Sequence, residues 1–250
     1  MPIKSKFAIS VKEKMQTWKQ IWLQKSVRNL SNITLQDLIV ASGFNTGVGS
    51  YNAKNWRIMV ADFCRKIALQ PDCKILEIGC GSGAFLYAIN EIYNVESYGI
   101  DYSESLVEVA KAAIPKGKFK AQPANQLSDF KTSFDIIFSH SVFFYFPDHE
   151  YVKKVISTWT KNLSSGGKFA LMDLPDEKHE ATYHSERMQE YKDPSKYEDD
   201  YKDLRHLFFN KEEMIQYLES IGMENVQLFP HVVTSYGNAR FRFNIICTKP

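Results

Sequence analysis

The chain has 250 residues, 44% of them hydrophobic, and its 31 basic and 29 acidic side chains give a formal net charge of +2. That length suits one α/β core with appended helices, and the near balance of charge argues against a surface that attracts nucleic acid. No apolar run approaches the roughly 20 residues needed to cross a bilayer, so we expect no membrane partner.

The cysteine pattern indicates a reducing compartment. The four cysteines form no Cys-x-x-Cys pair and have no histidine at zinc-ligand spacing. This pattern favours free thiols and argues against a metal site. The N-terminus carries charges where a signal peptide has its apolar stretch, so we expect a soluble cytoplasmic protein. The cysteines are Cys64, Cys73, Cys80 and Cys247.

The first 70 residues show helical periodicity. Apolar residues recur at three- and four-residue spacing over 11–25, which predicts an amphipathic helix. A second helix is expected from Thr34 and a third from Asn52 to Leu69. The loop between them contains three glycines that break the helical pattern. We treat residues 1–70 as a helical cap, with Val11, Met15, Trp18 and Trp22 on the apolar face of its first helix.

From Lys74 the pattern changes to short apolar strands that alternate with helices. This alternation predicts a parallel sheet with helices on both faces, so residues 71–250 are assigned to one α/β domain. The polar segment 175–206 interrupts the alternation and is read as a helical insertion or a solvated excursion. Two strand-like runs, 225–233 and 239–249, close the chain and place an antiparallel strand at the end of the sheet.

A glycine-rich turn follows the first strand of this domain in KILEIGCGSGAF, residues 74–85. Its glycines permit a tight turn into the next helix and leave room for a ligand. The same glycines also satisfy a dinucleotide-binding pattern. Glu77 favours another cofactor, because a nicotinamide site would place its pyrophosphate close to this acid. The helices before the first strand and the pair of strands at the end of the chain also favour a cofactor other than a nicotinamide dinucleotide.

Four runs in this order carry a family resemblance. ILEIGCGSGAF, GIDYS, FDIIFSHSVFFYF and LSSGGKFALMDL resemble the class I, Rossmann-like methyltransferases that depend on S-adenosyl-L-methionine. The resemblance covers residues 70–174 and the C-terminal strands, and YGNARFRFN at 236–244 is similar to the tail of a bacterial small-molecule group. It implies a seven-stranded, mostly parallel sheet with a C-terminal antiparallel strand. It also implies that the cofactor leaves as S-adenosyl-L-homocysteine.

The resemblance also implies the cofactor contacts. Glu77, Gly79 and Gly81 would lie against the methionine part, and Asp101 would accept both ribose hydroxyls, because a carboxylate suits a vicinal diol. Tyr102 would pack on the adenine. Pro123 stands where many relatives have an acid, so either the Ala124 backbone and Asn125 bind the adenine or no residue takes that role. The remaining cofactor residues of the set are Gly83 and Ser139.

The catalytic candidates follow the fourth strand, whose carboxyl end faces the ligand crevice in such sheets. For a hydroxyl acceptor, His140 is the expected general base, and a structural histidine is the alternative. Tyr145 ranks first among further candidates, which are His149, Tyr183, His184 and His206. Aromatic residues beside it would line an apolar acceptor pocket or belong to the core. They are Phe143, Phe144 and Phe146.

Four other functions compete with methylation of a small molecule, and one of them is a catalytically silent partner subunit that binds the cofactor without turnover. Enzymes that methylate exocyclic base nitrogens usually carry an Asn/Asp-Pro-Pro-aromatic segment after the fourth strand, and this chain has SHSVFF there. A protein or peptide acceptor would dock on residues 175–206, and a nicotinamide-dependent oxidoreductase is the rival reaction class. We expect a small-molecule acceptor with an oxygen or nitrogen nucleophile, no nucleic-acid partner, and a monomer or homodimer.

Overall fold

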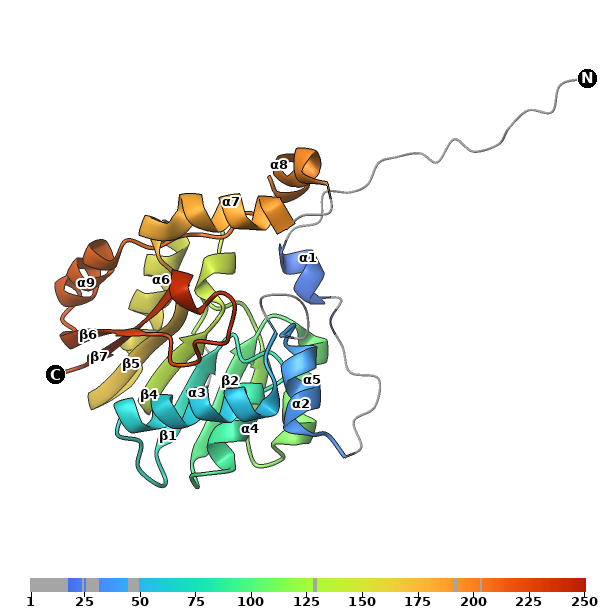
Figure 1. Cartoon of the computed structure of the whole chain (residues 1–250). Coiled ribbons are helices and arrows are strands. Elements are labelled where there is room, and N and C mark those ends of the chain that lie inside the picture. Colours follow the sequence, from blue (N-terminus) through green and yellow to red (C-terminus); the bar gives the residue numbers. More distant parts are fainter. Residues whose placement is uncertain are drawn as a thin grey trace, which may run out of the picture.

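Figure 1 shows the computed structural model of the chain, which describes residues 18–23, 25, 32–44, 50–127, 130–190, 193–202 and 204–250. Of the helix expected over 11–25, only α1 (Trp18–Leu23) falls within these ranges. Val11 and Met15 lie outside the described residues, as do Gly47 and Gly49 of the loop that follows the second helix.

Two further N-terminal helices begin where the sequence predicts. α2 (Leu35–Ala41) follows Thr34, whose hydroxyl accepts from the Asp37 amide while the Asp37 carboxylate accepts from the Thr34 amide. This reciprocal pair is a capping box, which satisfies two amides at the start of the helix. α3 (Ala53–Lys66) is capped by the side chain of Asn52 and ends three residues before the predicted boundary. Both starts therefore follow from local capping chemistry.

Seven strands form one sheet in the order β3-β2-β1-β4-β5-β7-β6. The first five pair in parallel, and β7 runs antiparallel to both β5 and β6. This arrangement confirms the predicted Rossmann-like fold with its C-terminal antiparallel strand. The strands are β1 (Lys74–Ile78), β2 (Glu96–Asp101), β3 (Lys118–Ala121), β4 (Phe134–His140), β5 (Leu163–Pro175), β6 (Glu224–Pro230) and β7 (Arg242–Thr248).

Helices cover both faces of the sheet, because alternate side chains of each strand point to opposite sides. In β4, Phe138 packs with the helices α2 to α5, whereas Ile137 packs with α6 and α9. The N-terminal helices thus share a hydrophobic core with the sheet. The flanking helices of the domain are α4 (Ala84–Asn90), α5 (Glu104–Ala113), α6 (His149–Thr160) and α9 (Lys211–Ser220).

The insertion after β5 is helical, as expected. Figure 1 shows α7 and α8 above the sheet, on the same side as α1. Tyr183 of α7 packs with Phe208 and Phe241 in a small buried cluster that joins the insertion to the C-terminal part of the chain. We call this inserted segment the cap from here on, and the name does not include the N-terminal helices of residues 1–70. It comprises η3 (Glu177–His179), α7 (Glu180–Glu190), η4 (Pro194–Lys196) and α8 (Tyr197–Tyr201).

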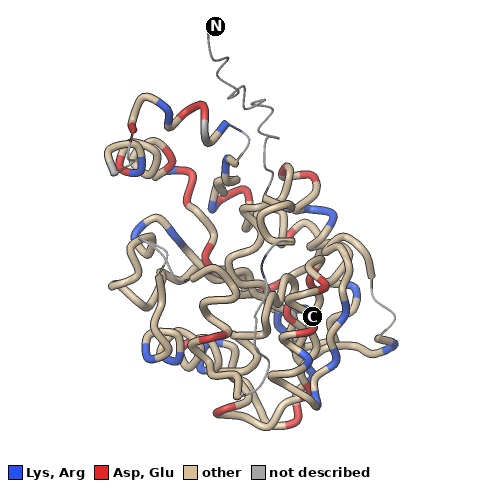
Figure 2. The backbone as a smooth tube through the Cα atoms, turned by 90° about the vertical axis from the view of Figure 1, so that its right-hand side faces the viewer, with Lys and Arg blue, Asp and Glu red and all other residues tan. Residues whose placement is uncertain are grey.

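The C-terminal strands are shorter than predicted. The first ends at Pro230 and the second begins at Arg242, so residues 231–241 form a connection that contains η5 (Ala239–Phe241). Basic and acidic positions are scattered over the whole backbone in Figure 2, in keeping with the small net charge. Within the described ranges, none of the helices has the length and apolar character needed to cross a membrane.

Candidate functional site

The glycine loop between β1 and α4 forms the floor of the site. Gly79 and Gly81 have φ values of +76° and +50°, a region that favours glycine. A Cβ on Gly79 would collide with the side chain of Val142, and one on Gly81 would lie 3.1 Å from the Ser42 hydroxyl oxygen. The Gly81 amide donates to Asp101 Oδ2 over 2.9 Å. The loop therefore needs glycine both for its conformation and for its close neighbours.

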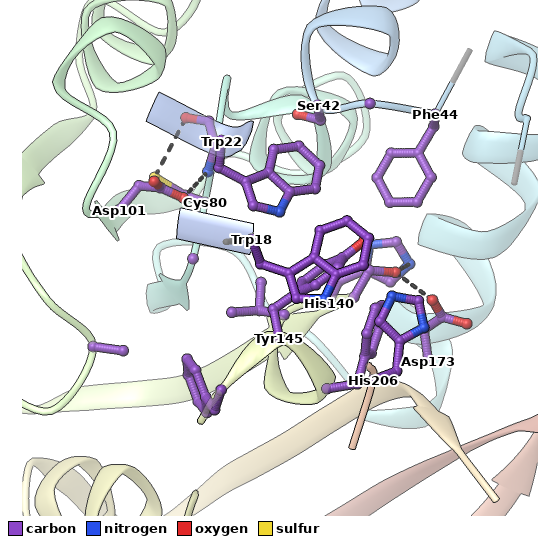
Figure 3. A pocket seen from close by; sticks show the side chains of 18 of the residues that line it. Trp18, Trp22, Ser42, Phe44, Cys80, Asp101, His140, Tyr145, Asp173 and His206 are labelled. Carbon is purple, nitrogen blue, oxygen red and sulfur yellow. Dashed lines mark hydrogen bonds between the residues drawn. The ribbon is translucent and has the colours of Figure 1, made fainter. Parts of the chain in front are cut away.

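A cavity of about 1080 Å³ opens at the carboxyl ends of β1, β2, β4 and β5. In Figure 3, Asp101 lies at one end and Asp173 with His206 at the other, while the indole rings of Trp18 and Trp22 lie between them. Residues of the cap and of the C-terminal connection complete the wall. The sheet thus supplies the floor, and segments distant in sequence supply the roof.

Two acids mark one end of this cavity. Glu77 is buried, and its Oε2 has no hydrogen-bond partner among the described residues. Burial, with the nearby charge of Asp101, raises the pKa of Glu77 well above its usual range. Burial also raises the pKa of Asp101, although its carboxylate accepts amides from Gly81 and Ser103. An unpartnered acid beside a second acid would be stabilised by a cationic ligand, so this end fits the ammonium and ribose of S-adenosyl-L-methionine.

The structure brings most of the predicted cofactor residues to this cavity. Glu77, Gly79, Gly81, Asp101, Tyr102 and Ala124 line it. The Ala124 carbonyl already accepts the Trp159 indole N–H over 2.6 Å.

Three predicted cofactor residues do not line the cavity. Gly83 faces helix α5, where an added Cβ would meet the Ala110 side chain at 3.1 Å. Ser139 is buried and donates its hydroxyl to the Ile78 carbonyl over 2.7 Å, which joins β4 to β1. Asn125 lies just outside the lining. The geometry gives Gly83 and Ser139 structural tasks in the floor of the site.

His140 ends β4 and faces the cavity, as the sequence predicts. Its ring centroid lies 5.6 Å from that of Phe44, and 5.2 Å from those of both Trp56 and Phe85. Burial in this aromatic surrounding lowers the pKa of His140 to about 4, and the nearby Asp173 offsets the effect in part. The imidazole is therefore neutral at physiological pH.

Tyr145, the second catalytic candidate, lies under the N-terminal helix. Its ring centroid is 4.7 Å from that of Trp18 and 5.5 Å from that of Trp22. Burial raises its pKa, so the phenol keeps its proton. Of the neighbouring phenylalanines, Phe144 and Phe146 line the cavity, whereas Phe143 belongs to the core.

Sequence reasoning missed a polar cluster at the end of β5. Asp173 is 1% exposed and has a φ of +62°. Its carboxylate accepts the hydroxyls of Ser141 and Tyr236, and its Oδ1 lies 3.7 Å from Arg242 Nε. Asp173 Oδ1 and Arg242 Nε are both buried without hydrogen-bond partners among the described residues. A ligand group that both donates and accepts hydrogen bonds would satisfy both atoms.

The sequence held one signal for this cluster. Asp173 lies near the carboxyl end of the apolar strand in KFALMDL, the same edge of the sheet that identified Ser139 and His140. Tyr236 and Arg242 belong to the 236–244 run that resembles the tail of a bacterial group, but that run did not predict where their side chains lie, because their place depends on how β7 pairs with β5. Tyr183 and His206 also line the cavity, whereas His149 and His184 do not.

The chain is similar to known methyltransferases. A family model described as "methyltransferase domain" matches residues 69–222. The chain is 28% identical over 116 residues to phosphoethanolamine N-methyltransferase 1 of Arabidopsis thaliana, covering 45% of this chain and 23% of that protein. It is 25% identical over 161 residues to a phosphoethanolamine N-methyltransferase of Triticum aestivum, covering 62% and 29%. The chain thus spans less than a third of these curated relatives.

Solved structures give the same fold. CalS10, an amino pentose methyltransferase from Micromonospora echinaspora solved with bound SAM, superposes with a TM-score of 0.58 at 14% identity, covering 78% of this chain and 92% of that one. ChlM from Synechocystis PCC 6803, a magnesium protoporphyrin IX methyltransferase solved with bound SAM, superposes with a TM-score of 0.56 at 13% identity, covering 88% and 99%. At these identities the likeness concerns the fold.

Proposed function

The chain belongs to the family of methyltransferase domains that use S-adenosyl-L-methionine, and from that premise we propose that it methylates an oxygen or nitrogen nucleophile of a small molecule. The observation that carries the proposal is a cavity at the carboxyl ends of the strands with two chemically distinct ends. Glu77 and Asp101, which have no cationic partner among the described residues, occupy one end, and the Asp173 and Arg242 pair occupies the other. The volume is in the range of pockets that enclose small ligands.

The acidic end would hold the cofactor. When bound, S-adenosyl-L-methionine supplies a methyl group on a cationic sulfur. Glu77 would accept from the ammonium of the methionine part, and Asp101 would accept from the ribose hydroxyls. Tyr102 would pack on the adenine, beside the Ala124 backbone. These roles use the partnerless Oε2 of Glu77 and the cavity-facing position of Asp101.

The other end would orient the acceptor. Asp173 Oδ1 accepts an N–H or O–H of the nucleophile, and Arg242 Nε donates to a neighbouring acceptor atom. Nitrogen is the first acceptor to test, because an amine hydrogen suits the partnerless oxygen of Asp173. The plant relatives are themselves named as N-methyltransferases.

A proton must leave the nucleophile, and His140 is the proposed base. Its Nε2 lies 3.4 Å from the Ser141 oxygen, and the Ser141 hydroxyl donates to Asp173. The three side chains therefore form a chain along which a proton can move from the acceptor toward a buried carboxylate. Tyr145 stays protonated and would donate a hydrogen bond or pack against the reacting groups.

The roof keeps water away from the reaction. Trp18 and Trp22 lie over Tyr145, and His206 stacks on Trp18 with ring centroids 4.9 Å apart. In-line transfer depends mainly on alignment of the nucleophile and exclusion of solvent. The aromatic roof would exclude solvent, and the polar floor would align the nucleophile.

The test is a methylation assay with labelled cofactor on a pool of small metabolites, followed by mass spectrometry. We expect a labelled small molecule from the unmodified protein. Asp173→Asn should slow labelling at least about tenfold, because a charged hydrogen bond to the acceptor is lost. Its affinity for S-adenosyl-L-homocysteine should stay the same. The matched control Asp72→Asn, exposed and outside the cavity, should label at the normal rate. Label found only in protein would overturn the proposal.

The cytoplasmic location and the oligomeric state stay predictions. The described cysteines are all free thiols, which supports a cytoplasmic location. Light scattering at several concentrations would tell a monomer from a homodimer.

A further inference from the structure

The charges that line the cavity are divided between its two sides. All three acidic lining residues, Glu77, Asp101 and Asp173, come from strands of the sheet. Three of the four basic lining residues belong to the cap and the segment directly after it: Arg187, Lys202 and Arg205. The described charged residues that line the cavity from this segment are therefore all basic.

Neutral groups hold Arg187 in place. Its guanidinium donates to the hydroxyls of Tyr183, over 2.6 Å, and Tyr201, over 3.1 Å, and lies over both rings. Arg187 forms no salt bridge to any described acidic residue, whereas Arg205 pairs with Glu198. A half-buried guanidinium fixed by neutral groups keeps its charge available to a ligand.

Hydrogen-bond donors without partners gather beside Arg187. The Tyr183 oxygen accepts from Arg187, so we assign its own hydrogen to His206 Nδ1, 3.2 Å away. Burial, together with the nearby arginines, lowers the pKa of His206 well below its usual range, so the ring is neutral and its single proton falls on Nε2. That Nε2 is buried without a partner in the described part of the chain, as is the indole N–H of Trp18, which stacks on His206.

Resting on the proposed function, we propose that the methyl acceptor carries an anionic group with several oxygens, a carboxylate or a phosphate, which binds between Arg187, His206 and Trp18. Each of these side chains offers only donors at this point, so the complementary group must consist of acceptors. A planar guanidinium matches the paired oxygens of such groups. Lys202 and Arg205 line the same end of the cavity, and Arg205 is paired there with Glu198.

The test uses the full chain saturated with S-adenosyl-L-homocysteine and titrated with inorganic phosphate or with acetate at constant ionic strength, followed by tryptophan fluorescence. We expect saturable binding of at least one anion. Arg187→Gln should weaken it at least about tenfold, the loss expected for a charged hydrogen bond. Arg187→Lys should restore part of the affinity. Arg65→Gln removes an exposed arginine outside the cavity and should change nothing.

The outcomes separate this inference from the proposed function. Calorimetry on the same samples reports S-adenosyl-L-homocysteine binding, and equal affinity in Arg187→Gln shows that the variant is folded. Failure of the unmodified protein to bind S-adenosyl-L-homocysteine would refute the proposed function itself. If S-adenosyl-L-homocysteine binds but neither anion does, or if Arg187→Gln and Arg65→Gln behave alike, only the anion site is refuted. Tighter binding of phosphate or of acetate assigns the kind of group.

Discussion

The buried state of His140 predicts a specific dependence of stability on pH. An unfolded-state histidine titrates near pH 6.5, whereas burial lowers the pKa of His140 to about 4. Between these values the unfolded chain binds the proton and the folded chain does not. The stability associated with the neutral ring is therefore fully present above about pH 6.5 and is lost as the pH falls toward 4. The shift corresponds to about 3 kcal/mol in the acid limit.

His140→Asn removes this titration. We expect the difference in unfolding free energy between the unmodified protein and the variant to shrink by about 2 to 3 kcal/mol between pH 7 and pH 4.5. Urea unfolding at the two pH values measures it. His206 and His231 also have lowered pKa values, but they titrate in both proteins and cancel in the comparison. Parallel pH curves for the two proteins would refute the buried, neutral state of His140.

The same variant tests the chemical role. If His140 takes the proton from the acceptor, His140→Asn should slow turnover about 100-fold with little change in cofactor affinity. The rate of the unmodified enzyme should be insensitive to His140 between about pH 5 and pH 8, because a group with a pKa of about 4 stays neutral there. Nearly full activity in the variant would make His140 a packing residue, with alignment by Asp173 carrying the catalysis.

Three further predictions concern the cofactor end. Asp101→Asn should weaken the binding of S-adenosyl-L-homocysteine by about 1.5 to 3 kcal/mol in calorimetry, because charged hydrogen bonds are lost. Asparagine keeps one acceptor oxygen for the amides of Gly81 and Ser103, whereas alanine would leave both amides without one. An unchanged affinity would remove Asp101 from the site. Gly81→Val should abolish binding of S-adenosyl-L-homocysteine, because a branched residue is strained at a φ of +50° and its Cβ approaches Ser42. Retained binding would contradict the assignment of the glycine loop to the cofactor. Cofactor affinity should rise with pH, because the pKa of Glu77 is raised in the free protein and a cationic ligand favours the ionised form of Glu77. Glu77→Gln should make the affinity less dependent on pH. An equal pH dependence in the variant would argue against a contact between Glu77 and the cofactor.

Much of the fold follows from patterns that are local in sequence. Strand and helix alternation predicts the parallel sheet, and capping residues such as Thr34 and Asn52 predict where helices begin. The glycine loop and Asp101 are equally local, because each directly ends a strand. Residues at the carboxyl ends of neighbouring parallel strands meet at one edge of the sheet, so the cofactor end of the cavity was accessible to prediction.

The acceptor end depends on geometry that no local pattern contains. β5 and β7 pair with an irregular register between Leu171 and Leu174, and Asp173 lies inside that irregularity with a positive φ. Such bulges re-aim a side chain, so simple alternation along the strand fails at this residue. The pairing of Arg242 with Pro175 then sets the arginine beside the site. Trp18 was predicted to lie on the apolar face of a helix, but in the structure its side chain lines the cavity.

The neutral histidines have a consequence for a cationic cofactor. Two positive charges 4 Å apart repel by about 4 kcal/mol at an effective dielectric constant of about 20, so a protonated imidazole beside the sulfonium would oppose binding. Burial keeps both His140 and His206 neutral, which removes that opposition. The cations of the cavity stand instead at the cap, where Arg187 faces the proposed anionic group, and beside Asp173, where Arg242 is balanced by a carboxylate. Positive charge that develops on a nitrogen acceptor during transfer would form next to Asp173, so the carboxylate that we propose orients the nucleophile would also stabilise the transition state.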